Sequence, residues 1–500
     1  YVYQSFFERS PEADISIGNT GYFSFRDNIS AKSNRFFNAG GIGAAANLTF
    51  DRILIDDPKE TPIQIGNLGP VLLMDNEIGY VNAPAVRVNP QAGFVSIENQ
   101  FSQPNPIVAK PNAFRMDKPE EILIADYFPP AGRLPIRQVS AIEMTPKDTT
   151  EAIQKAIDKA AGLDAKNAIV HFPVGQYAID KTLLIPANKS IRLIGEGADT
   201  VLSWRGQEGS PVIRFEGPSR AIVENLFING SGKADVIVIA NCDQPGSRVL
   251  MDQPNVATCK EVGYLVDGLD NAEVAMCNIN HSDCDIGVKV VGGALAREGK
   301  DSRGTTTIFS GSSSNNRISY TLADGGVLVV RDIWYESGSQ PGFLDLSGKG
   351  RFTLNGAMVA TAAKDNIPAI NIHDFDGQVT LLTSIFHSGC KAVPIRISGL
   401  SEQSMVLFLG SQFGMGDFAP VVEGDKGKVV VAECVRFTQG GGAEPVADIG
   451  TADPEIIKQM LTDTRGRDLP KQRKIEDSAT DLILHRVGVS NTRTGIRLSK

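Results

Sequence analysis

Five stretches of the chain repeat one pattern: VLVVRDIWYES (residues 327–337), RFTLNGAMVAT (351–361), QVTLLTSIFHS (378–388), SMVLFLGSQFG (404–414) and KVVVAECVRFT (428–438). Their first residues lie 24, 27, 26 and 24 positions apart. Each stretch is rich in β-forming residues, and a second β-rich run follows it after a short polar turn. A repeat of this length predicts a parallel β-helix, in which each strand hydrogen-bonds to the equivalent strand one rung away.

The same pattern extends toward the N-terminus. It appears in the stretches that begin at Arg220 and Ala272, and again in four runs between residues 22 and 101. In those four runs an acidic residue recurs every 23 or 24 positions, at Asp27, Asp51, Asp75 and Glu98. We interpret this column as strand-capping turns rather than a binding site, because Asp and Asn hydrogen-bond their own backbone in turns. The sequence therefore predicts two β-helical arrays, over residues 20–101 and 165–450.

One amphipathic helix stands between these arrays. In DTTEAIQKAIDKA (148–160) the apolar residues follow the i, i+3, i+4, i+7 spacing of a helix that packs on a core. Asp148 and Glu151 form a predicted capping box at its start. The open end of a β-helix exposes unpaired strands and apolar side chains. We therefore expect a helix over residues 149–161 to cover the first rung of the second array.

Sequence composition also divides the chain. Seven prolines between residues 103 and 137 predict an extended connector rather than a strand or helix. Near the C-terminus, DPEIIKQMLTDTRG predicts a helix that begins at Asp453, followed by a charged tail. The predicted domains are a partial first array, a linker, a second array with its capping helix, and a C-terminal helix and tail, over residues 1–102, 103–144, 145–450 and 451–500.

The charge balance limits the kinds of partner. The net charge is −9 and the isoelectric point is near 5.3, which argues against nucleic acid or an anionic membrane as the main partner. No apolar run reaches the ~18 residues of a membrane-spanning helix. Because rung-like sequence follows Tyr1 almost directly, we expect further residues or another chain at that end of the first array.

The six cysteines do not predict a metal site. They form no C-x-x-C pair and have no histidine at zinc-finger spacing. Buried thiols are one interpretation. Disulfides between Cys242 and Cys259, or between Cys277 and Cys284, are the alternatives.

Residues 145–205 carry a more specific pattern. It comprises an Asp-Thr pair and Ala-Ile-Gln in the helix, then V-x-F-P-x-G-x-Y, L-x-I-P and L-x-G-E-G-x-x-T-V-L. The residues that carry it are Asp148, Thr149, Ala152, Ile153, Gln154, Phe172, Pro173, Gly175, Tyr177, Ile185, Pro186, Gly195, Glu196 and Gly197. This pattern resembles the N-terminal part of the pectate-lyase-like superfamily. The resemblance implies an all-β fold, a right-handed parallel β-helix.

The order of the two arrays is similar to that of the tandem β-helix exo-β-1,3-glucanase family. That resemblance concerns the layout of the chain alone. The catalytic signatures of the superfamily are absent from the sequence. It has no W-x-D-H motif, no R-x-P-x-x-R motif and no set of N-T-D, D-D, G-H-G and R-I-K motifs like that of polygalacturonases. Because one fold hosts many functions, the resemblance does not by itself carry an activity.

Candidate catalytic residues come from comparing equivalent positions in successive rungs, since a β-helix lines up such side chains in columns. The tenth position of each stretch reads Asn229, His281, Glu336, Ala360, His387, Phe413 and Phe437. Glu336 with His387 is a predicted acid/base pair, because glycosidic cleavage needs a proton donor at the leaving oxygen. Asp332 is the nearest candidate partner, and a turn is its alternative interpretation. The predicted substrate-binding residues are Trp334, Tyr335, His281, His373 and Asp374.

Acidic residues near two histidines raise a second possibility, a calcium site. Asp283 and Asp285 follow His281, and Asp374 and Asp376 follow His373. Two carboxylates are too few for Ca²⁺ without ligands from other rungs. We therefore predict no cofactor, with calcium as the alternative.

Two classes of function remain. The favoured class is a carbohydrate-active enzyme, a glycoside hydrolase that degrades an extracellular polysaccharide, with a polysaccharide lyase as its variant. The other is a non-catalytic β-helical surface, fibre or adhesin protein. A hydrolase needs two carboxyl groups about 5–10 Å apart on one face, whereas a scaffold needs none.

Overall fold

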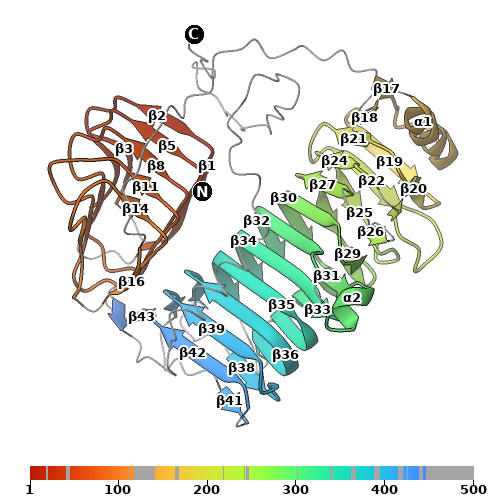
Figure 1. The fold of residues 1–500 in the computed structure, drawn as a ribbon. Helices are drawn as coiled ribbons and strands as arrows, with labels where there is room; N and C mark the ends of the chain where they lie inside the picture. Colours follow the sequence, from red (N-terminus) through yellow and green to blue (C-terminus); the bar gives the residue numbers. More distant parts are fainter. Residues whose placement is uncertain are drawn as a thin grey trace.

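The computed structural model describes residues 1–18, 21–40, 46–111, 113–117, 141–163, 168–217, 219–240, 243, 247–300, 302–337, 342–361, 368–387, 395–414, 421–424, 426–437 and 443–445. These residues form two parallel β-helices that lie side by side (Figure 1). The all-β prediction is confirmed. Within the described residues no helix is long and apolar enough to cross a membrane.

The first array has three parallel sheets, one for each strand of a rung. Sheet A comprises β1 (Val2–Tyr3), β4 (Gly21–Arg26), β7 (Ala46–Asp51), β10 (Val71–Met74), β13 (Phe94–Ile97) and β16 (Phe114–Met116). Sheet B comprises β2 (Phe6–Glu8), β5 (Ile29–Ala31), β8 (Leu54–Asp56), β11 (Glu77–Ile78) and β14 (Gln100–Phe101). Sheet C comprises β3 (Ala13–Ile17), β6 (Arg35–Ala39), β9 (Ile63–Ile65), β12 (Val86–Val88) and β15 (Ile107–Val108).

This array extends beyond its predicted limits at both ends. It begins at Val2 rather than near residue 20, and β15 and β16 continue it into the proline-rich segment. The expectation that this segment holds no strand is therefore wrong for its first part. Prolines flank these two short strands without entering them, so the pairing of their backbone groups is preserved. Residues 118–140 of the predicted linker lie outside the described residues.

The second array also has three strands in each rung. Its opening strands are β17 (Ala141–Glu143), β18 (Ala168–Phe172), β21 (Ile191–Gly195), β24 (Ile222–Glu224), β27 (Arg248–Asp252), β39 (Met405–Leu409) and β42 (Lys428–Ala432). Its middle strands are β19 (Gly175–Ile179), β22 (Thr200–Trp204), β25 (Phe227–Asn229), β28 (Asn255–Ala257), β37 (Ile385–His387), β40 (Gln412–Phe413) and β43 (Val435–Phe437). Its third strands are β20 (Leu183–Ile185), β23 (Ile213–Glu216), β26 (Ile237–Ala240), β29 (Val262–Leu269), β31 (Ile286–Gly292), β33 (Ile318–Ala323), β38 (Ile395–Ser398) and β41 (Val421–Glu423).

Longer strands join two of these positions in the central rungs, and β35 joins all three. They are β30 (Glu273–Ser282), β32 (Thr305–Ser314), β34 (Gly326–Ser337), β35 (Gly342–Thr361) and β36 (Ile370–Leu382). The predicted register holds from Val327 through Arg351 to Gln378, which are paired in successive rungs. At the next rung it is wrong by one residue, because Gln378 pairs with Met405 rather than Ser404. The last strand, β44 (Ala443–Pro445), pairs antiparallel with β43.

Helix α1 (Thr150–Gly162) covers the first rung of the second array, as predicted. Its buried side chains include Ile153, Ala156 and Ile157, which belong to the core of that array. The cap differs from the prediction: the Thr149 side chain accepts a hydrogen bond from the Ala152 amide, and Asp148 instead bonds the Thr145 amide. A second short helix, α2 (Ala294–Arg297), follows β31. The predicted C-terminal helix from Asp453 lies outside the described residues.

A left-handed residue marks the corner between the opening and middle strands of each rung. In the second array it is Asn278, Ser310, Asp332 and Gly356 in four successive rungs, all with φ between 50° and 78°. Such a residue breaks the strict alternation of side chains and turns the strand onto the next sheet. In the first array the corner residues are Asp27, Arg52, Asp75 and Glu98. The predicted acidic column is therefore wrong at one position, because Asp51 precedes the corner and Arg52 occupies it.

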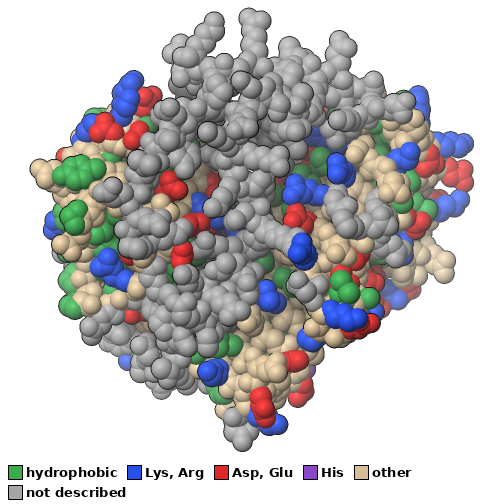
Figure 2. All heavy atoms as spheres, viewed as in Figure 1, with side chains coloured by type: hydrophobic (Ala, Val, Ile, Leu, Met, Phe, Trp, Pro, Cys, Tyr) green, Lys and Arg blue, Asp and Glu red, His purple; other side chains and the backbone are tan. Residues whose placement is uncertain are grey.

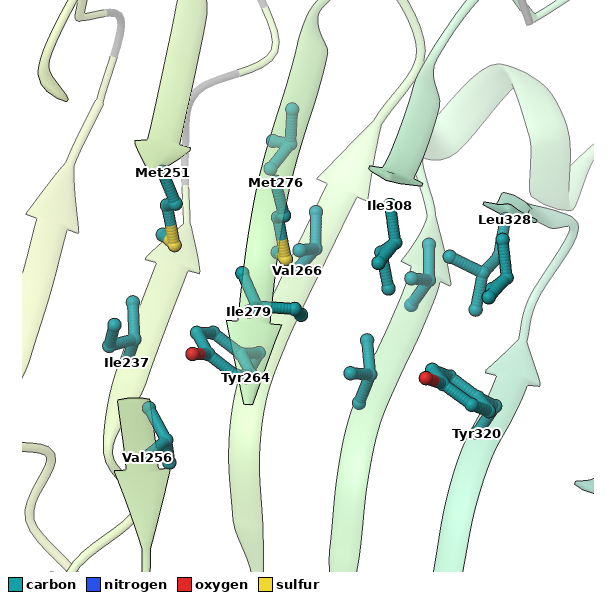
Figure 3. Packing of buried hydrophobic residues seen from close by; sticks show 14 of the residues in the cluster. Ile237, Met251, Val256, Tyr264, Val266, Met276, Ile279, Ile308, Tyr320 and Leu328 are labelled. Carbon is teal, nitrogen blue, oxygen red and sulfur yellow. The ribbon is translucent and has the colours of Figure 1, made fainter. Parts of the chain in front are cut away.

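The interior of the second array is apolar and stacked in register. Met251, Met276 and Ile308 are equivalent residues of three successive rungs, and they lie next to one another in Figure 3. All three are fully buried. Gly287 shows how close the packing is, since a Cβ there would lie 2.2 Å from Nδ1 of the buried His281. Each rung thus extends one continuous core, as a solenoid requires.

A disulfide connects two rungs of the second array. It joins Cys259 to Cys284, 25 residues apart, and Cys277 is a free thiol. The suggested pair of Cys277 and Cys284 is therefore wrong, and so is the suggested pair of Cys242 and Cys259. The sequence alone could not select the pair. In a stacked solenoid, equivalent residues of neighbouring rungs are close in space although about 25 residues separate them in the chain.

Candidate functional site

The central rungs of the middle sheet carry the predicted Glu336 column. Glu336 pairs with Ala360, and Ala360 pairs with His387, so this part of the column is confirmed. The side chain of His387 lies outside the described residues. On the N-terminal side, Glu336 continues through Ser314 to Ser282. His281 pairs instead with Ser313 and through it with Tyr335, one position away from the predicted column.

That one-residue shift places His281 in the core. Its side chain is 1% exposed and its ring lies between Tyr264 and Tyr320. The Asn316 amide lies 3.0 Å from Nδ1. Burial lowers the pKa of His281 to about 3, so the imidazole is neutral at pH 7. The predicted role of His281 in substrate binding is therefore wrong, because a ligand on the surface cannot reach it.

Asp332 lies at the contact between the two arrays, and its prediction as a catalytic partner of Glu336 is likewise wrong. It is fully buried, and Arg26 of β4 donates to it from Nε at 2.7 Å. The hydroxyls of Tyr3 and Tyr22 donate to its two oxygens, at 2.5 and 2.9 Å. Arg26 also bonds Asp51, with Nη1 2.5 Å from Oδ2. These five residues form what we call the polar junction.

Charges in the polar junction stabilise one another. Burial would lower the pKa of Arg26, but the attraction of Asp332 and Asp51 outweighs it and raises that pKa well above its ordinary value. Burial and the Asp332 carboxylate raise the pKa of Tyr3 and of Tyr22. Both phenols therefore remain protonated donors. The alternative interpretation of Asp332 as a turn residue is correct, since its φ of 56° is left-handed like that of the other corner residues.

An apolar contact continues the junction toward the last rungs. Leu72, Met74, Val95 and Ile97 of the first array pack against side chains of the second array. Those partners are Leu382, Leu407, Leu409, Val430 and Ala432. Lys110 also forms an ion pair with Glu433. The outer face of the opening sheet is thus occupied by the first array in these rungs, and the middle sheet faces elsewhere.

Trp334 and Glu336 point outward from the middle sheet, whereas Tyr335 between them points inward. Trp334 is 46% exposed, and its Nε1 donates to Oε2 of Glu336 at 3.3 Å. Tyr335 is fully buried, with its ring centroid 5.0 Å from that of Phe343. The prediction that Tyr335 binds substrate is therefore wrong, because alternate residues of a strand point to opposite faces.

The neighbours of this pair decide what chemistry it can perform. In the two adjacent rungs, Ser312 and Met358 are equivalent to Trp334, and Ser314 and Ala360 are equivalent to Glu336. None of these four side chains is ionisable. Glu336 can donate or accept a proton on an accessible surface. A second reacting group at its side must come from farther along the column, where His387 is the next candidate.

His373 and Asp374 lie on a different face of the second array, at the end of a third strand. His373 Nε2 is 3.3 Å from Oδ1 of Asp345, and its Nδ1 is 3.5 Å from Oδ2 of Asp374. Asp374 is a left-handed turn residue with an 87% exposed side chain. The structure therefore does not bring these two residues to the Trp334 and Glu336 pair.

The candidate calcium ligands do not form a metal site in the described part of the chain. Asp285 binds Arg317, with Oδ2 2.8 Å from Nη2, and this hydrogen bond lowers the pKa of Asp285. Asp283 is a left-handed turn residue. Among the residues that the structure describes, no group of three or more His, Cys, Asp or Glu side chains is arranged to hold a metal ion.

Three polar residues that the sequence comparison missed are equivalent to Trp334 in preceding rungs. They are Ser312, Asn280 and Asn255, paired in that order. We use the name Trp334 face for the outward positions of these rungs: Asn255, Ala257, Asn280, Ser282, Ser312, Ser314, Trp334, Glu336, Met358 and Ala360. Aligning the stretches on their corner residues, such as Asn278 and Asp332, would have found these equivalences.

Comparison with known proteins supports the fold rather than a particular activity. Residues 145–210 match a family described as "Rhamnogalacturonase A/epimerase, pectate lyase-like". With the parallel arrays, this match gives the chain the pectate-lyase-like β-helix fold and suggests a carbohydrate-active protein. No curated protein matches the chain.

Several solved structures are similar to this chain. One of them is a chain described as ORF18 of Geobacillus virus E2, with 15% sequence identity and a TM-score of 0.35. The similarity covers 59% of this chain and 61% of that chain. A similarity at this level supports no argument about function.

Proposed function

We propose that this protein is an extracellular carbohydrate-active β-helix protein that binds a polysaccharide on the Trp334 face and hydrolyses it with Glu336 as the general acid. The observation that carries the proposal is the half-exposed indole of Trp334 beside the exposed carboxyl group of Glu336. An indole ring stacks on the apolar face of a sugar, and a carboxyl group beside it can reach the glycosidic oxygen.

Two further observations support this function. The matched family is described by carbohydrate-active names, although the match at residues 145–210 does not include Glu336. The disulfide between Cys259 and Cys284 favours an oxidising compartment, which agrees with an extracellular location.

A non-catalytic glycan-binding protein is the second candidate. It is favoured by the adjacent rungs, in which the positions equivalent to Trp334 and Glu336 are not ionisable. Among the ten described outward positions Glu336 is the one carboxyl group, so the pair of carboxyl groups expected of a hydrolase is not found there. Hydrolysis by Glu336 would need His387 of the same column as its second group.

The test is a screen of the purified protein against plant, algal and microbial polysaccharides. New reducing ends without ultraviolet absorbance indicate hydrolysis, and absorbing unsaturated ends indicate elimination. Glu336→Gln keeps the side-chain shape but removes the proton donor, so it should lower turnover at least ~100-fold while unfolding is unchanged within ~0.5 kcal/mol. The matched control is Glu423→Gln, because Glu423 of β41 is an exposed carboxylate that pairs with Arg396 of β38.

Retained activity in Glu336→Gln would contradict the assignment of the acid. Binding without either product would contradict the enzymatic function and favour the non-catalytic candidate.

A further inference from the structure

We infer that the Trp334 face binds an uncharged polysaccharide that runs across the strands, with Asn255, Asn280 and Ser312 as its polar contacts. The inference rests on the proposed function and specifies its substrate class. It adds a binding surface three rungs long on the N-terminal side of Trp334. None of the ten described outward positions of the Trp334 face carries a basic side chain.

The register aligns these residues in one row. Asn255 pairs with Asn280, Asn280 with Ser312, and Ser312 with Trp334, so each rung contributes one side chain. Neighbouring parallel strands lie about 4.8 Å apart, so the row is about 14 Å long. Asn255, Asn280 and Ser312 are all partly exposed. A linear glycan laid along the row would therefore meet one polar side chain in each rung and the indole at the end.

Hydrogen bonds within the row fix the orientation of its side chains. Asn280 donates from Nδ2 to Oδ1 of Asn255 at 2.5 Å. Its own Oδ1 accepts from the amide and the hydroxyl of Ser312, at 2.9 and 2.6 Å. Amide and hydroxyl groups both donate and accept, as sugar hydroxyls do. Because these groups are already ordered, a ligand would lose less free energy in ordering them.

The charge of the Trp334 face selects among polysaccharides. Of its ten outward positions, only Glu336 is ionisable, and its carboxylate repels other carboxylates. Direct recognition of the carboxylates of a polyuronate is strongest with arginine or lysine, which form charge-assisted hydrogen bonds with them. On the described parts of the side that Figure 2 shows, lysine and arginine side chains lie among acidic ones. The Trp334 face therefore fits a neutral glycan.

Tryptophan fluorescence provides a direct test, because the chain has two tryptophans and only one is accessible. Trp204 is 1% exposed and Trp334 is 46% exposed. Acrylamide quenching of the full chain thus reports mainly Trp334. The probes are cellohexaose, laminarihexaose and mannohexaose as neutral ligands and hexagalacturonate as the charged one. At least one neutral probe should protect Trp334 from quenching, and hexagalacturonate should not.

Variants then locate the binding surface by calorimetry with the neutral probe that protects. Trp334→Ala should weaken binding at least ~10-fold, because it removes both the stacked ring and the apolar area that the ring would bury against the sugar. Asn280→Ala should weaken it about fivefold or more, because it removes one amide and releases its two neighbours. Gln64→Ala on β9 of the first array removes an amide far from the face, and it should leave binding unchanged.

The outcomes separate this inference from the proposed function. Binding that depends on Trp334 and Asn280 without turnover supports the inference and contradicts the enzymatic function. Turnover of a glycan that is unaffected by both substitutions supports an enzyme and overturns the inference. Tighter binding of hexagalacturonate, or no protection of Trp334 by any probe, also overturns it.

Discussion

Asp332 and Glu336 lie four residues apart on the same strand, yet they belong to opposite environments. Asp332 is fully buried in the polar junction, where Arg26 and two tyrosine hydroxyls bind its carboxylate. Glu336 is exposed on the Trp334 face and accepts one hydrogen bond, from the neighbouring indole. The left-handed corner at Asp332 separates the two regions, because the strand before it faces the first array and the strand after it does not.

The comparison shows that an acidic residue beside aromatic residues has two quite different uses in this fold. In the junction, tyrosines and an arginine hold a carboxylate in the interior, where an unpaired charge would be very costly. On the Trp334 face, the aromatic ring itself is the exposed group. We therefore expect substitutions in the junction to change stability strongly, and substitutions on the face to change binding instead.

The largest expected effect follows from removing the central cation of the junction. Arg26→Met leaves Asp332 buried without its guanidinium partner, which should reduce the free energy of unfolding by about 3–5 kcal/mol. Denaturant titration measures this change. Arg317→Met, which removes an exposed ion pair with Asp285, is the control and should cost less than about 1 kcal/mol. Equal effects of the two substitutions would contradict a structural role for the junction.

A smaller effect should follow from a methyl group at the corner next to Asp332. Gly356 has a φ of +78°, and a Cβ there would lie 1.7 Å from the Tyr22 hydroxyl and 2.7 Å from Oδ1 of Asp332. Gly356→Ala must therefore displace the Tyr22 ring and disturb its hydrogen bond with Asp332. Gly348 has a similar φ of +71° but no atom within 4 Å of its Cβ position. Gly348→Ala is thus the control for backbone strain alone.

Thermal and denaturant unfolding should rank these two glycine variants. We expect Gly356→Ala to cost at least about 2 kcal/mol more than Gly348→Ala, within the range for overpacked interiors. A difference below about 0.5 kcal/mol would show that the junction adapts without cost, and the contrast with the Trp334 face would then disappear.

Per pH unit, the smallest change in stability is expected from the protonation of His281, which lies beneath the Trp334 face. Burial lowers the pKa of His281 to about 3, from an ordinary value of 6.5. The unfolded chain therefore binds a proton below pH ~6.5 that the folded protein does not bind until pH ~3. The stability linked to His281 is complete above pH ~6.5 and decreases as the pH falls toward 3, by up to about 1.4 kcal/mol for each pH unit.

Denaturant unfolding at several pH values between 3.5 and 7.5 measures this slope. His281→Gln removes the titrating ring, so its stability should depend less on pH across this window, whatever its absolute value. Gly348→Ala removes no titratable group and contacts none, so it should keep the slope of the original protein. An unchanged slope in His281→Gln would contradict the neutral, buried histidine.

The sequence predicts the repeat and the capping helix well for physical reasons. Strand periodicity and the apolar spacing of Ile153 and Ile157 are local properties, and the structure buries both isoleucines as expected. The site was predicted less well. His281 and Asp51 were each assigned to a column one position away from their true one, and in a strand a shift of one residue reverses the face. Tyr335 was included with Trp334 although adjacent residues alternate.

By itself the sequence determined that this chain stacks rungs of about 25 residues into two parallel arrays, because β propensity, turn residues and helix amphipathicity act over short distances along the chain. It also identified Trp334 and Glu336 as candidates. Only the tertiary structure decided that Asp332 forms a buried ion pair with Arg26, which lies more than 300 residues earlier in the chain. It also decided that Asn255, Asn280 and Ser312 lie in one row with Trp334. Contacts between arrays and the exact register depend on how distant segments pack, and the corner residues set that register by turning each strand at one position.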